Sequence, residues 1–325
     1  WKTMDYCLYK LKFDGAVHFG QSESALSLYT AADHFRADTL FSALCHTALA
    51  LWGEEGLREI VEQAESDELR LSDSMPWRGK QYYLPKPCAV SEQKREVPAQ
   101  LRKAIKKLAW IPVSDMDLFE RSIRGEALYT PGDAAFGMVV ERASAAVVEG
   151  ADAEPYQIGA FRFFPECGLY VLAGVKTMDQ AEKLHTLLSA LGMSGIGGKV
   201  SSGYGSFTVT ETHVLSQTTD EQLKWLNAAL NASGAKHQLL LTTSLPTDAE
   251  LDDVLENAQY QLVRRAGYVQ SETFAASPVR KRTQYFLAAG AMLERPFRGA
   301  LYTVAENGGH PVLRYAKPMT LGVAF

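Results

Sequence analysis

Apolar and polar residues alternate at the start of the chain, which is typical of a half-buried β-strand. Within residues 6–13, Lys10 and Lys12 fall on one face, and the other face carries Cys7, Tyr9, Leu11 and Phe13. A helical spacing follows, in which Asp38 is placed to cap a helix and Gly53 to end it. The apolar face of this helix would consist of Leu40, Phe41, Leu44, Ala48 and Leu51.

Strands and helices continue further along the chain. Residues 168–175 predict a strand, and Thr177 with Gln180 then forms a capping box that opens a helix reaching Gly192. Residues 206–214 predict another strand, and residues 219–231 predict a connecting helix.

After Gly234 the order of elements restarts. Residues 237–243 predict a strand, and Thr247 with Glu250 forms a second capping box before a helix. Two further strands are predicted at 260–269 and 284–292. Strand, helix, strand, strand is half of a split β-α-β unit.

We therefore predict an α+β protein with two modules, residues 1–215 and 235–325, joined by a connector helix within 216–234. An insertion at about residues 74–150 enlarges the first module. Its many prolines and glycines are unfavourable for core helices, and a long excursion of this kind is usually functional or disordered.

Length and composition fit a globular chain. The 325 residues are 46% hydrophobic and 22% charged, enough to bury a core in about two domains. No uncharged run approaches the ~20 apolar residues of a spanning helix. The four cysteines form no C-x-x-C pair, and the start of the chain does not resemble a signal peptide, so we expect reduced thiols and a cytoplasmic protein.

Charge is distributed unevenly although the net charge is only -5. Residues 53–73 hold eight acidic residues against two basic ones, whereas residues 86–107 are strongly basic. The basic block could neutralise RNA phosphates, or it could be a solvated helix face. A further basic cluster lies at 280–282. The residues of the block that we select as candidate RNA contacts are Lys86, Lys94, Arg95, Arg102, Lys103, Lys106 and Lys107.

The segment 192–205 contains six glycines. Glycine lets a ligand approach the main chain, whose N–H groups can form an anion-binding nest. Met193 and Val200 break the phosphate-loop and dinucleotide patterns, so ATP or NAD is disfavoured and we expect no cofactor. The alternative is a connector without function. The candidate RNA-binding residues here are Gly195, Gly197, Gly198, Lys199, Ser201, Ser202, Gly203, Tyr204 and Gly205.

This glycine-rich segment resembles that of the RAMP superfamily of CRISPR proteins. The whole chain is similar, more specifically, to the Csm-type subunit of type III-A effector complexes that holds the 5′ end of the crRNA. The further segments that carry the resemblance are residues 17–20, 38–44, 83–87, 110–112, 260–267, 288–292 and 310–318. Ala291 and Ala316 depart from the pattern, which leaves details of the C-terminal segment less closely matched.

The resemblance implies two ferredoxin-like (RRM-related) domains, the first with a thumb-like insertion. It implies a non-catalytic, antiviral RNA-binding subunit whose glycine loop cradles the crRNA 5′ handle. The implied partners are crRNA and, through it, target RNA, together with a large polymerase-like CRISPR subunit and a backbone RAMP subunit. No membrane contact is implied.

Two other functions stay open at this stage. Some RAMP relatives are metal-independent endoribonucleases with a general acid/base histidine, for which His18 or His34 is the candidate. The glycine loop could instead be a protein interface. We favour RNA contact for His18, with its neighbours Phe19 and Gly20, and stacking of a base on Tyr204. No metal-binding motif is present in the sequence.

Overall fold

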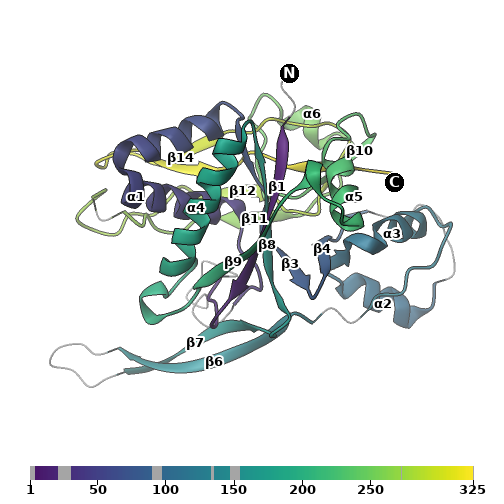
Figure 1. Ribbon diagram of the computed structural model, residues 1–325, viewed down its shortest axis with the longest axis horizontal. Helices are drawn as coiled ribbons and strands as arrows, with labels where there is room; N and C mark the ends of the chain where they lie inside the picture. The colour runs from purple at the N-terminus through teal and green to yellow at the C-terminus, as the bar shows by residue number, and fades with distance from the viewer. Residues whose placement is uncertain are drawn as a thin grey trace.

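The computed structural model describes residues 4–20, 31–89, 97–132, 135–146, 154–271 and 273–324, without the side chains of 142–146 and 154–156. It has mixed α/β architecture with antiparallel sheets. A seven-stranded sheet runs through the centre of the molecule, two long helices lie at one side of it, and a hairpin extends along its lower edge (Figure 1). No helix in these ranges is both long and apolar enough to cross a membrane.

The central sheet has the order β5-β4-β3-β8-β1-β9, and β2 also pairs with β8. Its strands are β1 (Asp5–Phe13), β2 (Leu69–Leu71), β3 (Met75–Arg78), β4 (Gln81–Pro85), β5 (Trp110–Pro112), β8 (Cys167–Val175) and β9 (Phe207–Val214). The three strands predicted for this half, at 6–13, 168–175 and 206–214, are confirmed as β1, β8 and β9.

Strand β1 lies between β8 and β9 and is covered on both faces in its middle. The alternating pattern is present, but the predicted polar face is not solvated at Lys10. Its ammonium is 2.8 Å from a carboxylate oxygen of Glu211 and 4.3 Å from the ring centre of Trp77. An ion pair and a cation–π contact therefore replace water around this charge.

Helices α1 (Ala37–Glu65) and α4 (Met178–Ser194) lie side by side, and Lys183 of α4 pairs with Glu59 of α1 at 2.7 Å. The capping box of Thr177 and Gln180 is confirmed at the start of α4. Two predictions for α1 were wrong. Arg36, not Asp38, is its N-cap residue, and Gly53 (φ 70°) breaks the helical geometry without ending the helix.

The segment predicted as an insertion contributes to the central sheet. β3 pairs with β8, and β4 and β5 extend the sheet from β3. Trp77, Leu84 and Ile111 are buried in the same core as β1 and β8. This part of 74–150 therefore belongs to the core, contrary to the expectation of an insertion outside it. Helices α2 (Ala99–Lys107) and α3 (Met116–Ile123) follow at the right of Figure 1.

The strands β6 (Gly137–Ala146) and β7 (Glu154–Phe163) form the long hairpin of Figure 1. It is attached at its base to the first loop of the chain, where Val17 and Phe161 exchange two backbone hydrogen bonds of 2.8 Å. The hairpin therefore shares its base with the loop that follows β1.

Helix α5 (Glu221–Leu230), capped by Asp220, confirms the helix predicted at 219–231. The second half contains β10 between β13 and β16, and two separate ladders, β11-β12 and β14-β15. The bounds are α6 (Leu251–Leu255), β10 (His237–Leu240), β11 (Leu262–Arg265), β12 (Gln284–Leu287), β13 (Met292–Leu293), β14 (Leu301–Ala305), β15 (Val312–Tyr315) and β16 (Thr320–Val323).

Two details of this half differ from the sequence expectation. The strand predicted at 284–292 is divided into β12 and β13. The second capping box is not formed, because Thr247 donates both its amide and its hydroxyl to Glu250, which is the N-cap of the short helix α6.

Buried polar contacts at the start of α1 join the two halves. Asp73 accepts hydrogen bonds from the amide of Ala37 (2.9 Å) and from the amide and hydroxyl of Thr243 (3.0 and 2.6 Å). At the second residue of the helix, the carboxylate of Asp38 receives two hydrogen bonds from Arg265 of β11, at 2.8 and 2.9 Å. Bidentate pairing fixes the angle as well as the distance between the partners.

This ion pair yields a stability prediction. The side chains of Asp38 and Arg265 are 7% and 16% exposed, so removing either one breaks a buried bidentate ion pair, of which Asp38 keeps only the longer contact to Nε of Arg314, at 3.9 Å. We expect Asp38→Asn or Arg265→Gln to lower the free energy of unfolding by about 3 kcal/mol in urea titrations. The double variant should lose less free energy of unfolding than the two single variants lose in sum, because the two residues interact directly.

The exposed pair of Glu221 and Lys224 supplies the control. Glu221→Gln should leave the unfolding midpoint nearly unchanged, since exposed pairs contribute little. Strictly additive losses in the Asp38 and Arg265 cycle would show that the pair does not couple the two halves.

Candidate nucleic-acid interface

The glycine loop, residues 195–205, connects the end of α4 to β9. Its two ends are held together by a hydrogen bond from the amide of Ile196 to the carbonyl of Gly205, at 3.0 Å. The amide of Gly205 in turn donates to the carbonyl of Ala16, and that of Gly198 to the carbonyl of His18, at 3.1 and 2.9 Å. The loop is therefore fixed against the segment that follows β1 and is not a slack connector.

Close packing explains why glycine occupies several loop positions. A Cβ atom on Gly197 would lie 2.9 Å from the carbonyl oxygen of His18 and from the ring of Phe19. On Gly198 it would lie 2.7 Å from the imidazole of His18. Gly205, at φ 78°, would direct a Cβ onto the backbone of Ile196. These three glycines permit a backbone approach that no side chain would allow.

The outer part of the loop presents main-chain donors. Lys199 adopts the left-handed conformation (φ 60°), and a single 3-10 turn, Val200–Ser202, follows. The amides of Gly197, Val200 and Ser201 donate no hydrogen bond to any residue that the structure describes, and all three residues are exposed. Amides that point outward from a left-handed turn form a concavity suited to an anion.

His18 and Phe19 lie beside the loop, but their side chains are covered. Nδ1 of His18 donates to the carbonyl of Gly159 on β7, at 2.6 Å, and the side chain is only 7% exposed. The ring of Phe19 packs edge-on against Phe13 and Phe35. The expectation that these side chains face RNA is corrected, because they attach the hairpin and the glycine loop to the core. Gly20 is exposed at the end of the same segment.

Tyr204 is likewise not available as a stacking platform. Its residue is 6% exposed, whereas its neighbours Lys199 and Ser201 to Gly203 are exposed or half-buried. The sequence placed this ring in a loop, but in the structure the residue is buried although its neighbours are not. The prediction that a base stacks on Tyr204 is therefore corrected by burial.

The C-terminal part of the basic block forms helix α2, and Lys86 directly follows β4. Arg102, Lys103, Lys106 and Lys107 are exposed on α2. Lys86, in contrast, donates from Nζ to the carbonyls of Ile105 and Lys106, at 2.9 and 3.2 Å. It satisfies the C-terminal carbonyls of α2, and burial lowers its pKa, so its role is structural rather than the expected phosphate contact. Lys94 and Arg95 lie outside the described residues.

The structure separates the two predicted contact regions. Helix α4 ends at the lower left of Figure 1, where the glycine loop begins, and α2 lies at the right edge of the same view. The base of the hairpin β6-β7 lies between them. A single short stretch of nucleic acid could thus contact only one of the two regions, whereas a longer one could follow the hairpin.

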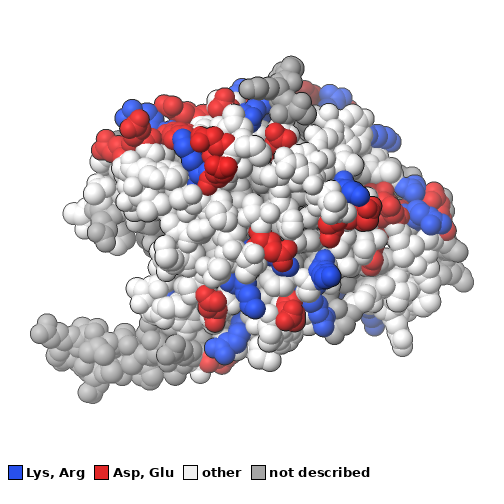
Figure 2. Space-filling view, in the orientation of Figure 1, with Lys and Arg blue, Asp and Glu red and all other residues white. Residues whose placement is uncertain are grey.

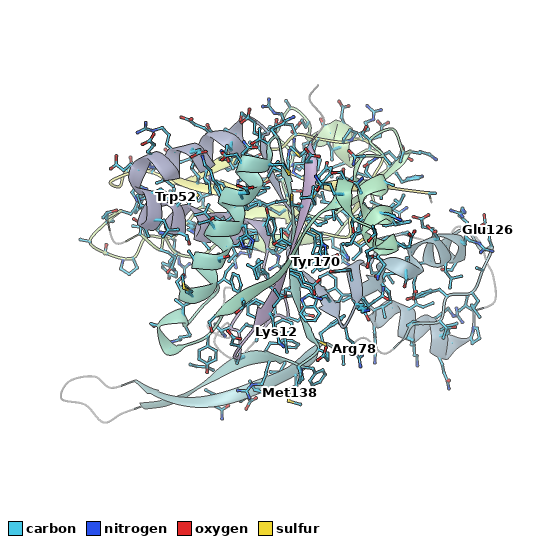
Figure 3. The ribbon with its side chains drawn as sticks, viewed as in Figure 1. Lys12, Trp52, Arg78, Glu126, Met138 and Tyr170 are labelled. Atoms are coloured by element: carbon cyan, nitrogen blue, oxygen red, sulfur yellow. The ribbon has the colours of Figure 1, made fainter. Side chains whose placement is uncertain are left out.

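Basic residues that the sequence analysis did not select surround this base. Lys12 at the end of β1 and Arg78 at the end of β3 lie at the lower end of the molecule, above Met138 of β6 (Figure 3). Arg162 is exposed on β7, opposite Met138. They are scattered in sequence, so no local charge run marked them, and only the pairing of the strands brings them to one end.

The acidic stretch lies elsewhere. Figure 2 shows the red side chains gathered over α1 at the upper left. Glu54, Glu55, Glu62 and Glu65 are its exposed members in the second half of that helix. Negative charge disfavours RNA on this face and leaves the lower end as the better candidate.

The second candidate histidine has a carboxylate partner. Nδ1 of His34 is 2.8 Å from Asp33, whose other oxygen accepts from the indole of Trp110 at 3.3 Å. Burial would raise the pKa of Asp33, but the hydrogen bonds and charge of these neighbours lower it overall. Within the described ranges, no three His, Cys, Asp or Glu residues are grouped so that they could hold a metal ion.

Comparisons with known proteins agree with this architecture. A family model described as the CRISPR Csm4 C-terminal domain matches residues 233–323. The chain is 35% identical over 324 residues to "CRISPR system Cms protein Csm4" of Mycobacterium tuberculosis, with 98% of each chain covered. It is 30% identical over 325 residues to the protein of the same name from Streptococcus thermophilus, covering 97% of this chain and 98% of the relative.

Solved structures share the fold. A chain in the crystal structure of a Csm1-Csm4 cassette in complex with pppApA has a TM-score of 0.63 and 21% identity, with 98% of both chains covered. A chain in a Csm3-Csm4 subcomplex of the type III-A CRISPR-Cas interference complex has a TM-score of 0.64 and 18% identity, covering 99% of this chain and 100% of the other.

Two glycines of the loop give a matched test of its packing. Both have positive φ, 78° at Gly205 and 84° at Gly203, but only Gly205 has neighbours within reach of a Cβ. Gly203→Ala should lower the free energy of unfolding by about 1 kcal/mol, because alanine is strained in the left-handed conformation. Gly205→Ala should cost about 3 kcal/mol, because overlap with Ile196 adds to that strain. Equal urea midpoints for the two variants would contradict the described loop.

Proposed function

The chain belongs to the Csm4 family, and from this premise we propose that it holds the 5′ handle of crRNA in a type III-A CRISPR effector complex. The observation that carries the proposal is the glycine loop. It is anchored to the core on one side and presents outward amides, two serines and Lys199 on the other. Such donors bind phosphates without reading bases, as a subunit that serves many guides requires.

The exposed loop residues form the first contact region. Gly197 and Gly203 are exposed and Gly198 is half-buried, so the backbone at these positions can approach the ligand. Gly195 and Gly205 are buried and instead close the loop, because the amide of Gly195 donates to the end of α4 and the carbonyl of Gly205 accepts from Ile196. The hydroxyls of Ser201 and Ser202 and the ammonium of Lys199 supply further donors. Tyr204 is buried and would support the loop rather than contact RNA.

A second contact region follows from the hairpin and α2. We propose that β6-β7 is the thumb that extends toward the first guide nucleotides. Lys12, Arg78 and Arg162 at its base lie where they could neutralise the phosphates between handle and guide. The exposed basic side chains of α2 would extend this basic surface.

The same proposal assigns the domains. Residues 1–215 would be an N-terminal ferredoxin-like domain with the thumb-like insertion, and residues 235–325 a second ferredoxin-like domain. The helix α5, within the connector 216–234, supports this division because it separates the central sheet from the sheet around β10.

The partners follow from the solved relatives, which were crystallised as Csm1-Csm4 and Csm3-Csm4 assemblies. We propose that this chain likewise links the large polymerase-like subunit to the first backbone subunit, and meets target RNA through the crRNA. The acidic face of α1 is suited to a protein neighbour rather than to RNA.

The subunit would act without catalysis and without a cofactor. His18 is enclosed and already bonded to Gly159, so it cannot reach a ribose hydroxyl without the hairpin moving. His34 is bonded to Asp33 and packs edge-on against Trp110 at 5.2 Å between ring centres. General acid/base work needs a side chain within hydrogen-bond reach of the reacting group.

Lys199→Ala tests the handle-binding proposal. We expect the affinity of the purified chain for handle RNA to fall about tenfold, because one charge-assisted phosphate contact is lost. The salt dependence of binding should fall by about one ion, and the loss should be the same for guides of different sequence. Lys236→Ala, at an exposed lysine in the second half, is the control and should bind as the parent does. A loss that depends on guide sequence would contradict phosphate recognition.

A cleavage assay separates this function from the endoribonuclease alternative. Repeat RNA incubated with the protein in EDTA should stay intact, for the parent chain and for His34→Ala alike. Cleavage by the parent that His34→Ala abolishes would establish the enzyme instead.

A further inference from the structure

We propose that the second half of the chain carries a separate binding surface for single-stranded RNA, on an antiparallel arm formed by residues 262–269 and 279–287. The arm shares no residue with the glycine loop or with α2. The inference therefore goes beyond handle binding and can fail or stand independently of it.

The arm is one continuous pairing with a bulge. β11 and β12 pair from Leu262 opposite Leu287 to Arg265 opposite Gln284. Beyond the ladder, Tyr268 pairs with Arg280, and Val269 donates to the carbonyl of Val279 at 2.9 Å. The register shifts by one residue between these two sections, as a β-bulge requires.

A buried arginine holds this bulge rigid. Arg314, which is 5% exposed, donates to the carbonyls of Arg265, Ala266 and Arg282, each at 3.0 Å. Arg265 itself is held by Asp38 at the start of α1. The backbone of the arm is thus fixed before any ligand binds, which reduces the entropic cost of binding.

Aromatic and cationic side chains are paired on the exposed side of the arm. Arg264 lies directly opposite Tyr285, whose residue is 58% exposed. Neither side chain has a hydrogen bond, ion pair or ring contact with another residue in the part of the chain described. Tyr268, 46% exposed, stacks with Arg280, whose guanidinium carbon is 5.4 Å from the ring centre. Nε of Arg280 also donates to the Tyr268 hydroxyl at 3.0 Å.

The two tyrosine–arginine pairs are four residues apart, or about 13 Å along the strand. Each offers a ring face for a base and a guanidinium for a phosphate. That combination is how single-stranded nucleic acid is held without sequence preference.

The charge of the arm has the required sign. Residues 260–287 contain five basic residues and one acidic residue, in a chain whose net charge is -5. The positive charge of this region is also felt at His46 of α1. Burial lowers the pKa of His46 most, and the charges of Lys281 and His310 lower it further. Positive charge alone would also suit an acidic protein. The exposed tyrosine faces favour RNA, and unstacked bases favour a single strand over a duplex.

Binding of a fluorescent, mixed-sequence single-stranded RNA of about 16 nucleotides, within the usual site size, tests the proposal. The full-length chain is titrated at several salt concentrations. Tyr285→Ala should weaken binding about tenfold through the loss of one stacked base, whereas Tyr285→Phe, which keeps the ring, should bind as the parent does. Arg264→Ala should lower the salt dependence by about one ion. Arg295→Ala is the matched control, because Arg295 is exposed in the same half but paired with Glu256 at 2.7 Å.

The outcomes separate this surface from the glycine loop. A second site is supported if Tyr285→Ala and Arg264→Ala each weaken RNA binding, and if the binding free energy that they lose adds to the loss caused by Lys199→Ala. Unchanged binding in both arm variants overturns the inference, even where Lys199→Ala still weakens handle binding. The inference would also be overturned if the arm variants lost affinity equally for a duplex of the same sequence, or equally for polyglutamate used as a competitor. The arm would then recognise negative charge alone.

Discussion

The start of helix α1 is the point on which the arrangement of both halves depends. Asp73 accepts the amide of Ala37 and both donors of Thr243, and Asp38 binds Arg265 in bidentate geometry. Both carboxylates lie at the positive end of the helix dipole. Buried carboxylates are tolerated only when they are hydrogen-bonded or paired. The second half therefore cannot shift against the central sheet without leaving charges of both halves unsatisfied.

This joint sets the positions of the proposed contact surfaces. The chain before α1 passes Phe35 and Phe19, whose rings are in edge-on contact, to the segment on which the glycine loop rests. His18 lies in the same segment and connects it to the hairpin by its hydrogen bond to the carbonyl of Gly159. On the other side of the joint, Arg265 belongs to the arm of Arg264 and Tyr285. The glycine loop, the hairpin and the basic arm are thus linked through one rigid core.

The separation of charge gives each face a different use. Acidic side chains gather over α1, whereas exposed basic ones occupy α2, the hairpin base and the arm. A chain with a net charge of -5 can therefore bind RNA locally, because phosphates respond to nearby charge within about a Debye length. The acidic face over α1, by the same reasoning, repels phosphates.

The sequence by itself determined β1, β8, β9, the capped helix α4 and the glycine loop, because their signals are local: alternation, a capping box and glycine density. It also placed the chain in its family. It could not determine that Lys10 and Lys86 are bound inside the structure, that Tyr204 and His18 are covered, or that Asp73 rather than Asp38 meets the first amide of α1. Lys12, Arg78 and Arg162 likewise come together only at the hairpin base. Burial and pairing between distant segments are properties of the tertiary structure, since a side chain's exposure depends on which strands lie beside it and not on its neighbours in sequence.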